Sequence, residues 1–435
     1  MATYMIQSLL KTADDSMEHN PDEFYASQTQ YEQLVRTYWC CFAQDCELSS
    51  GARQHFALSF RQISVPLPIG DGDFNYGHVP SRRWMPADMS RDCPLFTTLT
   101  IDHGLTIVTR GFDIFVRILR FANESRRGHA LSSPSVTPSS QQTWQNLKKE
   151  LDEWRALQDP TVQYPVTPAQ VHVAMGHGEL FAYINLVYFM SVLFLYRDQV
   201  LSGVKAVSEL DHVQGAPNIQ ETTSAEKAIA YLFEAAQNIG GILSALETSG
   251  APVITPYAGF SVFVAAHINM YGTVSPRLYP GGQERAEQEK NANLFYLERL
   301  CELWPVGTNW WRTVQEANKF YETARGNQEN AGSSDGANPL ALGGTLDEYG
   351  DIRVCRPGQE TPTSAPRRRG STSETPGVQH SRRRNSVPLS TLSASEHTMF
   401  EHHDLETEML QWPFISEAWS SGFDTGFDSA WPSLG

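Results

Sequence analysis

The chain has 435 residues, of which 40% are hydrophobic, so it can bury a sizeable core. A net charge of −16 excludes a bulk surface that wraps nucleic acid, because phosphate binding needs a basic face. The charge is uneven: residues 356–395 carry seven Arg and two Glu, whereas residues 396–435 carry eight acidic residues and no Lys or Arg. The first fifteen residues, MATYMIQSLLKTADD, lack a secretory signal, so we expect a reduced, intracellular protein.

Residues 1–325 are predicted to form one all-α, helical bundle-like regulatory domain. Segments with apolar residues at helical spacing are separated by Pro, Gly and Ser, and no alternating strand pattern or long repeat interrupts them. The expected loop at 131–140 is rich in Ser and Pro. Ser224 is the expected N-cap of its helix. The expected helical segments are Tyr25–Glu47, Phe96–Arg126, Thr143–Leu157, Leu180–Tyr196, Ser224–Glu247, Pro256–Tyr271 and Ala286–Tyr321.

The segment Leu180–Tyr196 is apolar enough to raise the question of a membrane span. Its 17 residues include Asn185 and Ser191, and a span needs about 20 apolar residues. The sequence therefore favours a buried core helix, with a membrane span as the alternative.

The composition changes after residue 325. Residues 326–395 are rich in Gly, Ser, Pro and Arg and are predicted to be a disordered linker, since they cannot bury enough apolar surface to order. Residues 396–435 form an acidic, aromatic tail.

Three of the six cysteines lie within seven residues, in YWCCFAQDC. Zinc sites pair thiolates at spacings such as C-x2-C, whereas Cys40 and Cys41 are adjacent and point about 100° apart on a helix. Trp39, Phe42 and Cys46 fall on one helical stripe instead. We expect core packing rather than a metal or redox site.

The same stretch carries a family resemblance, in VRTYWCCFAQDCELSSG followed by ISVPLP and GDGDF. It resembles the middle homology region of fungal zinc-cluster transcription factors, in which this motif is architectural rather than catalytic. The matching residues are Arg36, Trp39, Phe42, Asp45, Leu48, Ser49, Gly51, Arg53, Val65, Pro66, Leu67, Pro68, Asp71, Asp73 and Phe74.

The resemblance continues to about Tyr321, because LKKELDEW, Pro160 and a very apolar helix follow in the family's order. It departs from the family in its Gly-Arg-Pro loop, which reads Ala52-Arg53-Gln54, and in lacking the six-cysteine cluster that binds two zinc ions. We therefore expect this chain to bind no zinc and to make no direct contact with DNA. It is either a regulator without its zinc cluster or an N-terminally truncated sequence.

Two clusters of three arginines lie in the linker. Their spacing suits a bipartite nuclear import signal, and a solvated linker is the alternative. Each cluster is followed by a serine in an Arg-Arg-x-Ser pattern, Ser371 and Ser386, where a phosphate would offset the adjacent charge. The arginines are Arg367, Arg368, Arg369, Arg382, Arg383 and Arg384.

The tail alternates acidic and aromatic residues and repeats Gly-Phe-Asp. This composition is typical of disordered activation segments, in which repelling acids keep the aromatic side chains available to a coactivator groove. The alternative is a tail that packs on the body of the same chain. The candidate residues are Phe423, Asp424, Phe427, Asp428 and Trp431.

The sequence contains no nucleophile elbow, phosphate loop, dinucleotide fingerprint or zinc-hydrolase motif, so we expect no enzyme and no cofactor. The favoured function is a nuclear regulator of RNA polymerase II transcription. Its expected partners are a coactivator, bound through the tail, and either a DNA-binding protein or a second copy of the chain; no membrane is expected. The alternative is a helical protein- or small-molecule-binding module without a role in transcription.

Overall fold

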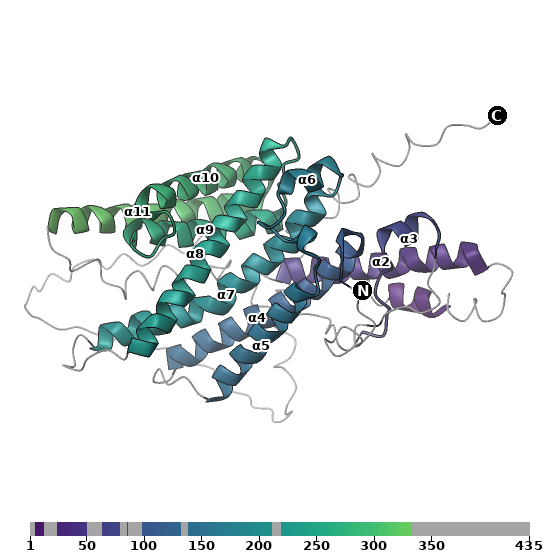
Figure 1. The fold of residues 1–435 in the computed structure, drawn as a ribbon, viewed down its shortest axis with the longest axis horizontal. Helices are drawn as coiled ribbons and strands as arrows, with labels where there is room; N and C mark the ends of the chain where they lie inside the picture. The colour runs from purple at the N-terminus through teal and green to yellow at the C-terminus, as the bar shows by residue number, and fades with distance from the viewer. Residues whose placement is uncertain are drawn as a thin grey trace, which may run out of the picture. The chain divides into compact units, whose positions relative to one another are not determined.

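The computed structural model describes residues 5–12, 24–49, 63–78, 85, 98–131, 138–210 and 219–331. This part of the chain is all-α, as predicted, and its β pairing is limited to one isolated bridge between Leu99 and Gln158 (Figure 1). Residues 5–12 are helical, and short 3₁₀ turns span Ile101–His103 and Pro160–Val162. The longer elements are α2 (Phe24–Ser49), α3 (Asp71–Asn75), α4 (Gly104–Leu131), α5 (Pro138–Ala156), α6 (Ala169–Ala174), α7 (Gly178–Leu210), α8 (Ile219–Thr248), α9 (Pro256–Val274), α10 (Gly282–Leu303) and α11 (Pro305–Ala331).

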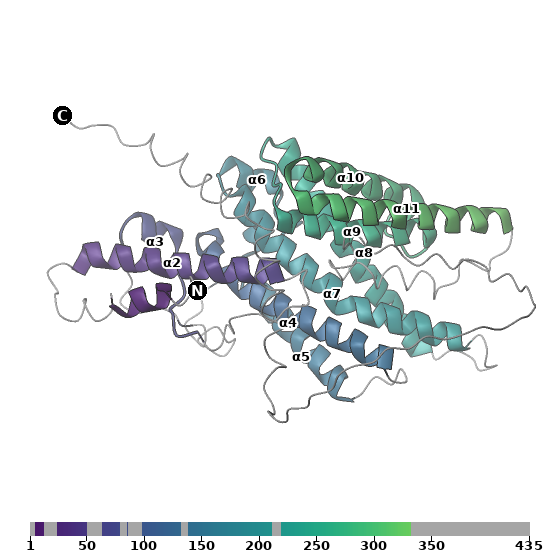
Figure 2. The ribbon, with the colours of Figure 1, turned by 180° about the vertical axis from the view of Figure 1, so that it is seen from behind.

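Helix α9 lies at the centre of the C-terminal half. Every residue from Tyr257 to Val274 is buried, which fits a helix that is apolar on all sides. Thr255 caps it by accepting a hydrogen bond from the Ala258 amide, and Pro256 starts its first turn. Helices α8, α10 and α11 pack around it, and Figure 2 shows α10 and α11 lying along it.

Helix α7 is the second core element. It packs against α4 and α8 and contains the apolar segment discussed above. Within the described part of the chain, residues 178–197 are long and apolar enough to cross a membrane, and 78% of that window is buried inside the fold. This degree of burial agrees with the favoured prediction of a core helix.

Several predicted boundaries were wrong. The helix expected from Phe96 begins only at Gly104, because the Leu99 amide donates to the Leu157 carbonyl and the Leu99 carbonyl accepts from Asp159. Ser224 is not an N-cap, since α8 begins at Ile219. The expected loop at 131–140 is shorter, because α4 includes its first residue and α5 begins at Pro138.

The last predicted helical region is two helices. Helix α10 ends at Leu303 and α11 begins with Pro305, because proline has no amide proton to continue the hydrogen-bond ladder. Trp304 between them donates through its indole to the Ile254 carbonyl at 3.0 Å. Helix α11 continues to Ala331, past the expected boundary at 325.

Candidate functional site

The residues of the family resemblance begin on α2. Trp39, Phe42 and Cys46 form a fully buried stripe, as expected, and the Trp39 ring meets the Tyr38 and Phe42 rings edge-on at 5.5 Å. This stripe fixes which side of α2 faces the core. Side chains on this side of α2 can therefore reach residues 65–69, which follow the helix in sequence.

That segment, residues 65–68, is an extended strap between α2 and α4. Pro66 and Pro68 restrict it to extended conformations, and all four of its residues are buried. The Trp39 indole donates to the Pro66 carbonyl at 2.6 Å, and the Thr106 hydroxyl of α4 donates to the Pro68 carbonyl at 3.2 Å. Both proline carbonyls of the strap therefore accept a hydrogen bond, one from α2 and one from α4.

Arg36 ties the end of the strap to α2. Its guanidinium donates to Asp71 at 2.7 Å, to the Ile69 carbonyl at 2.8 Å and to Glu32 at 3.2 Å, and it stacks over the Phe74 ring at 4.3 Å. The Glu32 side chain is fully buried, and it also accepts from the Ile69 amide at 3.1 Å. One arginine therefore satisfies a buried carboxylate and fixes the start of α3.

The turn into α3 needs small residues. Asp102 accepts from the Gly72 amide at 2.6 Å, and a Cβ atom at Gly72 would lie 3.2 Å from the same carboxylate. A Cβ at Gly70 would collide with Asp102 outright. The glycines in GDGD thus allow the close approach of this carboxylate. We call Glu32, Arg36, Trp39, Asp102 and residues 65–74 the α2 clamp.

Ten of the fifteen residues that match the family motif lie in the α2 clamp or against it. They are Arg36, Trp39, Phe42, Val65, Pro66, Leu67, Pro68, Asp71, Asp73 and Phe74. Asp45 is half-buried one turn further along α2, and burial together with its charge raises the pKa of the Cys46 thiol well above its ordinary value. The Ser49 side chain, Gly51 and Arg53 lie outside the described residues. Sequence reasoning missed Glu32 and Asp102; the four-residue spacing from Glu32 to Arg36 was the available signal for the first.

The three cysteines of the cluster lie in three different environments. Cys40 is exposed, Cys41 is half-buried and Cys46 is buried, and burial raises the pKa of the Cys41 and Cys46 thiols. No group of three or more His, Cys, Asp or Glu side chains suited to a metal ion occurs in the described part of the chain.

A second polar cluster joins α4 to α5. Arg110 and Arg117 of α4 both bind Asp113 and Glu150, with Arg117 to Glu150 at 2.7 Å and Arg117 to Asp113 at 2.8 Å. The Glu150 carboxylate turns away from solvent onto the two arginines of α4. The cluster is charge-balanced and joins two helices, so we interpret it as structural.

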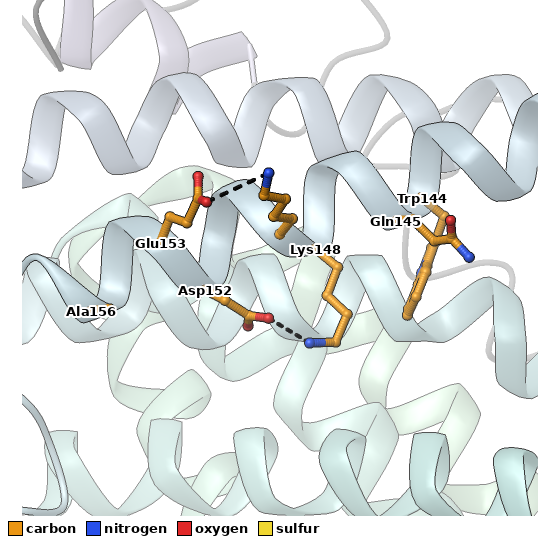
Figure 3. A pocket seen from close by; sticks show the side chains of 7 residues that line it. Trp144, Gln145, Lys148, Asp152, Glu153 and Ala156 are labelled. Carbon is orange, nitrogen blue, oxygen red and sulfur yellow. Dashed lines mark hydrogen bonds and ion pairs between the residues drawn. The ribbon is translucent and has the colours of Figure 1, made fainter. Parts of the chain in front are cut away.

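The described surface has an open depression of about 440 Å³ along α5 (Figure 3). All of its lining residues come from this one helix, including Trp144, Lys148 and Lys149. Each lysine is paired within the helix, Lys148 with Asp152 at 2.5 Å and Lys149 with Glu153 at 3.8 Å. Its charges are therefore neutralised, and it offers no convergent set of groups for chemistry.

The remaining predicted site residues cannot be placed. The arginine clusters at 367–369 and 382–384, the serines Ser371 and Ser386, and the tail residues 423–431 all lie outside the described part of the chain.

Comparison with known proteins gives one informative similarity. The chain is 21% identical over 300 residues to the Zn(2)-C6 fungal-type transcription factor FTF1c of Fusarium oxysporum f. sp. lycopersici. The chain is similar to a fungal transcription factor. The alignment covers 66% of this chain and 30% of that protein, so the chain spans less than a third of its relative's length. No family model and no solved structure matches the chain.

Proposed function

We propose that this chain is a regulator of RNA polymerase II transcription in a fungus, built on the middle homology region of the zinc-cluster family. The observation that carries the proposal is the α2 clamp. The residues that resemble the family motif contact one another across long stretches of sequence, Arg36 with Asp71 over 35 positions and Trp39 with Pro66 over 27. The similarity to a fungal-type transcription factor over 300 residues supports the same family.

A binding and positioning role fits the described residues better than catalysis. Buried charged side chains form ion pairs in the α2 clamp, in the α4–α5 cluster and on α10, and the open depression on α5 holds two internal ion pairs. The helical body would accordingly serve as a regulatory module that contacts other proteins or an effector.

The acidic tail would supply activation. Residues 396–435 carry eight acids and seven Phe or Trp residues, the composition that keeps aromatic side chains solvated and available to a coactivator. DNA would be reached through a DNA-binding partner or through a zinc cluster outside this sequence, and this chain itself would hold no zinc.

A tethered reporter assay tests the activation role. The full chain is fused to a heterologous DNA-binding domain and expressed with a reporter that carries its site. We expect activation above the DNA-binding domain alone, reduced at least about tenfold by Phe423→Ala, Phe427→Ala and Trp431→Ala together, because these side chains supply the apolar contacts with a coactivator. The matched control replaces three tail serines by alanine and should leave activation intact. These serines are Ser420, Ser421 and Ser429. A reporter signal no higher than that of the DNA-binding domain alone would refute the activation role.

Nuclear entry would depend on the arginine clusters. Alanine at Arg367–Arg369 and at Arg382–Arg384 should move a fluorescent fusion of the chain to the cytoplasm. Aspartate at Ser371 and Ser386 should weaken entry, because a nearby negative charge offsets the arginines. Unchanged nuclear fluorescence in the arginine variants would remove the import assignment.

A further inference from the structure

Two adjacent glycines, Gly240 and Gly241, lie in the middle of α8. Among residues that can donate to the helical hydrogen-bond ladder, glycine is the least favourable in a helix interior, so a pair of them there needs a reason. Both glycines are only half-buried, so solvent reaches this part of the helix. Because they have no side chains, groups from neighbouring elements can approach the α8 backbone closely.

Polar atoms from two directions occupy the space that side chains at the two glycines would fill. A Cβ atom at Gly240 would lie 3.1 Å from Asn293 Oδ1 and 3.2 Å from Glu289 Oε2, both on α10. A Cβ atom at Gly241 would lie 2.7 Å from the hydroxyl of Tyr164, in the loop before α6. Three oxygen atoms, two from α10 and one from the loop, therefore converge on the same turn of α8.

Two of these polar side chains are buried and incompletely paired. Asn293 is 1% exposed, and its Nδ2 atom has no hydrogen-bond partner within the described part of the chain. Glu289 is 7% exposed and forms its ion pair with Arg285 through Oε1, whereas Oε2 faces Gly240. A buried amide without a partner is costly, so Asn293 points to a bound group beside Gly240.

Electrostatics join the loop to α10. Burial raises the pKa of the Tyr164 hydroxyl, and the negative charge of Glu289 raises it further, while Arg285 acts in the opposite direction. The hydroxyl thus lies within the field of the Arg285–Glu289 ion pair. We call Tyr164, Gly240, Gly241, Arg285, Glu289 and Asn293 the α8–α10 site.

The chemistry of the α8–α10 site favours a ligand that carries charges of both signs. An ammonium group has three N–H donors and no acceptor, which matches the oxygen atoms of Glu289, Asn293 and Tyr164. The Asn293 Nδ2 donor and the Arg285 guanidinium need an acceptor close to that ammonium group, and a carboxylate serves both. An anion alone would be repelled by Glu289, and a cation alone would leave the Asn293 donor without a partner.

We propose that the α8–α10 site binds a free α-amino acid, whose ammonium group faces Glu289 and whose carboxylate faces Asn293 and Arg285. The two charged groups of an α-amino acid share one carbon atom, and Glu289 and Asn293 lie about one helical turn apart on one side of α10, which suits that short separation. Glycine at positions 240 and 241 lets the ligand approach the α8 backbone. As an account of regulation this inference rests on the proposed function, but binding is measured on the purified chain and succeeds or fails separately.

Isothermal titration calorimetry of the purified 435-residue chain tests the proposal. The probes are the L-amino acids found in proteins, each titrated alone. We expect at least one of them to bind with a dissociation constant on the order of 0.1 mM, the range for a ligand of about ten non-hydrogen atoms. The corresponding amine without the carboxylate, and the corresponding acid without the amine, should each bind at least about tenfold more weakly, because each loses one charged contact.

Conservative substitutions locate the ligand. Tyr164→Phe removes only a hydroxyl and Glu289→Gln removes only a charge, so each should weaken binding at least about tenfold. The matched controls are Tyr76→Phe, at a residue 80% exposed, and Glu298→Gln, at an exposed residue of α10. Both controls should bind as the wild type does, and far-ultraviolet circular dichroism checks that all four variants are folded.

The proposal is overturned if no amino acid binds at concentrations up to about 10 mM, in which case ordered water satisfies Asn293. It is also overturned if the folded Tyr164 and Glu289 variants bind as tightly as their controls, or if the amine without the carboxylate binds as tightly as its parent amino acid. A chain that binds no amino acid but still activates the tethered reporter would leave the proposed role in transcription in place.

Discussion

Arg36→Met is the substitution that most sharply tests the α2 clamp. It removes the guanidinium from Glu32, Asp71 and the Ile69 carbonyl while keeping an apolar stem of similar length. The largest cost comes from Glu32, whose side chain is 0% exposed and would remain as a buried charge. Breaking a buried pair in this way costs about 3–5 kcal/mol. The pair with Asp71, which is 36% exposed, adds at most about 1 kcal/mol.

Glu32 keeps its hydrogen bond from the Ile69 amide, so we expect a loss of about 3 kcal/mol, at the low end of that range. Replacing Glu32 by Gln in the same chain removes the buried charge and should recover about 2 kcal/mol of this loss. Urea unfolding followed by far-ultraviolet circular dichroism measures the double-mutant cycle. Arg312→Met on the exposed face of α11 is the control and should change stability by less than about 0.5 kcal/mol.

The reasoning fails if Arg36→Met costs no more than the Arg312 control. It also fails if the Glu32 and Arg36 substitutions are additive, because additivity means that the two side chains do not interact in the folded protein.

Three further predictions concern the helical body. Glu150→Ala should lower the free energy of unfolding by about 3 kcal/mol, because it leaves two arginines of α4 short of a carboxylate; Lys149→Ala, 75% exposed on the same helix, should cost under about 0.5 kcal/mol. Burial lowers the pKa of His267 to about 4, so the unfolded chain takes up a proton first as the pH falls. The free energy of unfolding should therefore fall by up to about 3 kcal/mol between about pH 6.5 and pH 4. Plotted against pH, the free energy of unfolding of His267→Asn should change less over that window. Parallel curves for the variant and the wild type would contradict this. Gly111→Ala should cost about 2 kcal/mol, since its methyl would lie 2.6 Å from the Trp154 ring, whereas Gly326→Ala meets nothing within 4 Å and should be neutral or stabilising by thermal unfolding.

The helices were predictable from the sequence where their own residues decide the outcome. The nearly continuous apolar sequences of α7 and α9 predicted their burial, and the stripe of Trp39, Phe42 and Cys46 on α2 lies in the core as expected. The start of α4 was not predictable, because it depends on the pairing of Leu99 with residues near 158, a contact distant in sequence. The same holds for Glu150, whose direction is set by two arginines of another helix.

The candidate site divides in the same way. The motif in the sequence indicated which residues belong together, from Arg36 to Pro68, but not how they touch. The four-residue spacing from Glu32 to Arg36 could have indicated Glu32, whereas Asp102 reaches the α2 clamp through a contact with Gly72 across 30 positions, which no local spacing predicts.

Mapping the chromatin contacts of the full chain tests the central claim most directly. The chain carries an epitope tag at its own locus, and its crosslinked DNA is compared with the transcripts that change when it is depleted. The account predicts enrichment at promoters of RNA polymerase II genes, and that these genes are over-represented among the changed transcripts. A chain without promoter enrichment, whose depletion leaves those transcripts unchanged, would contradict the claim that it regulates transcription.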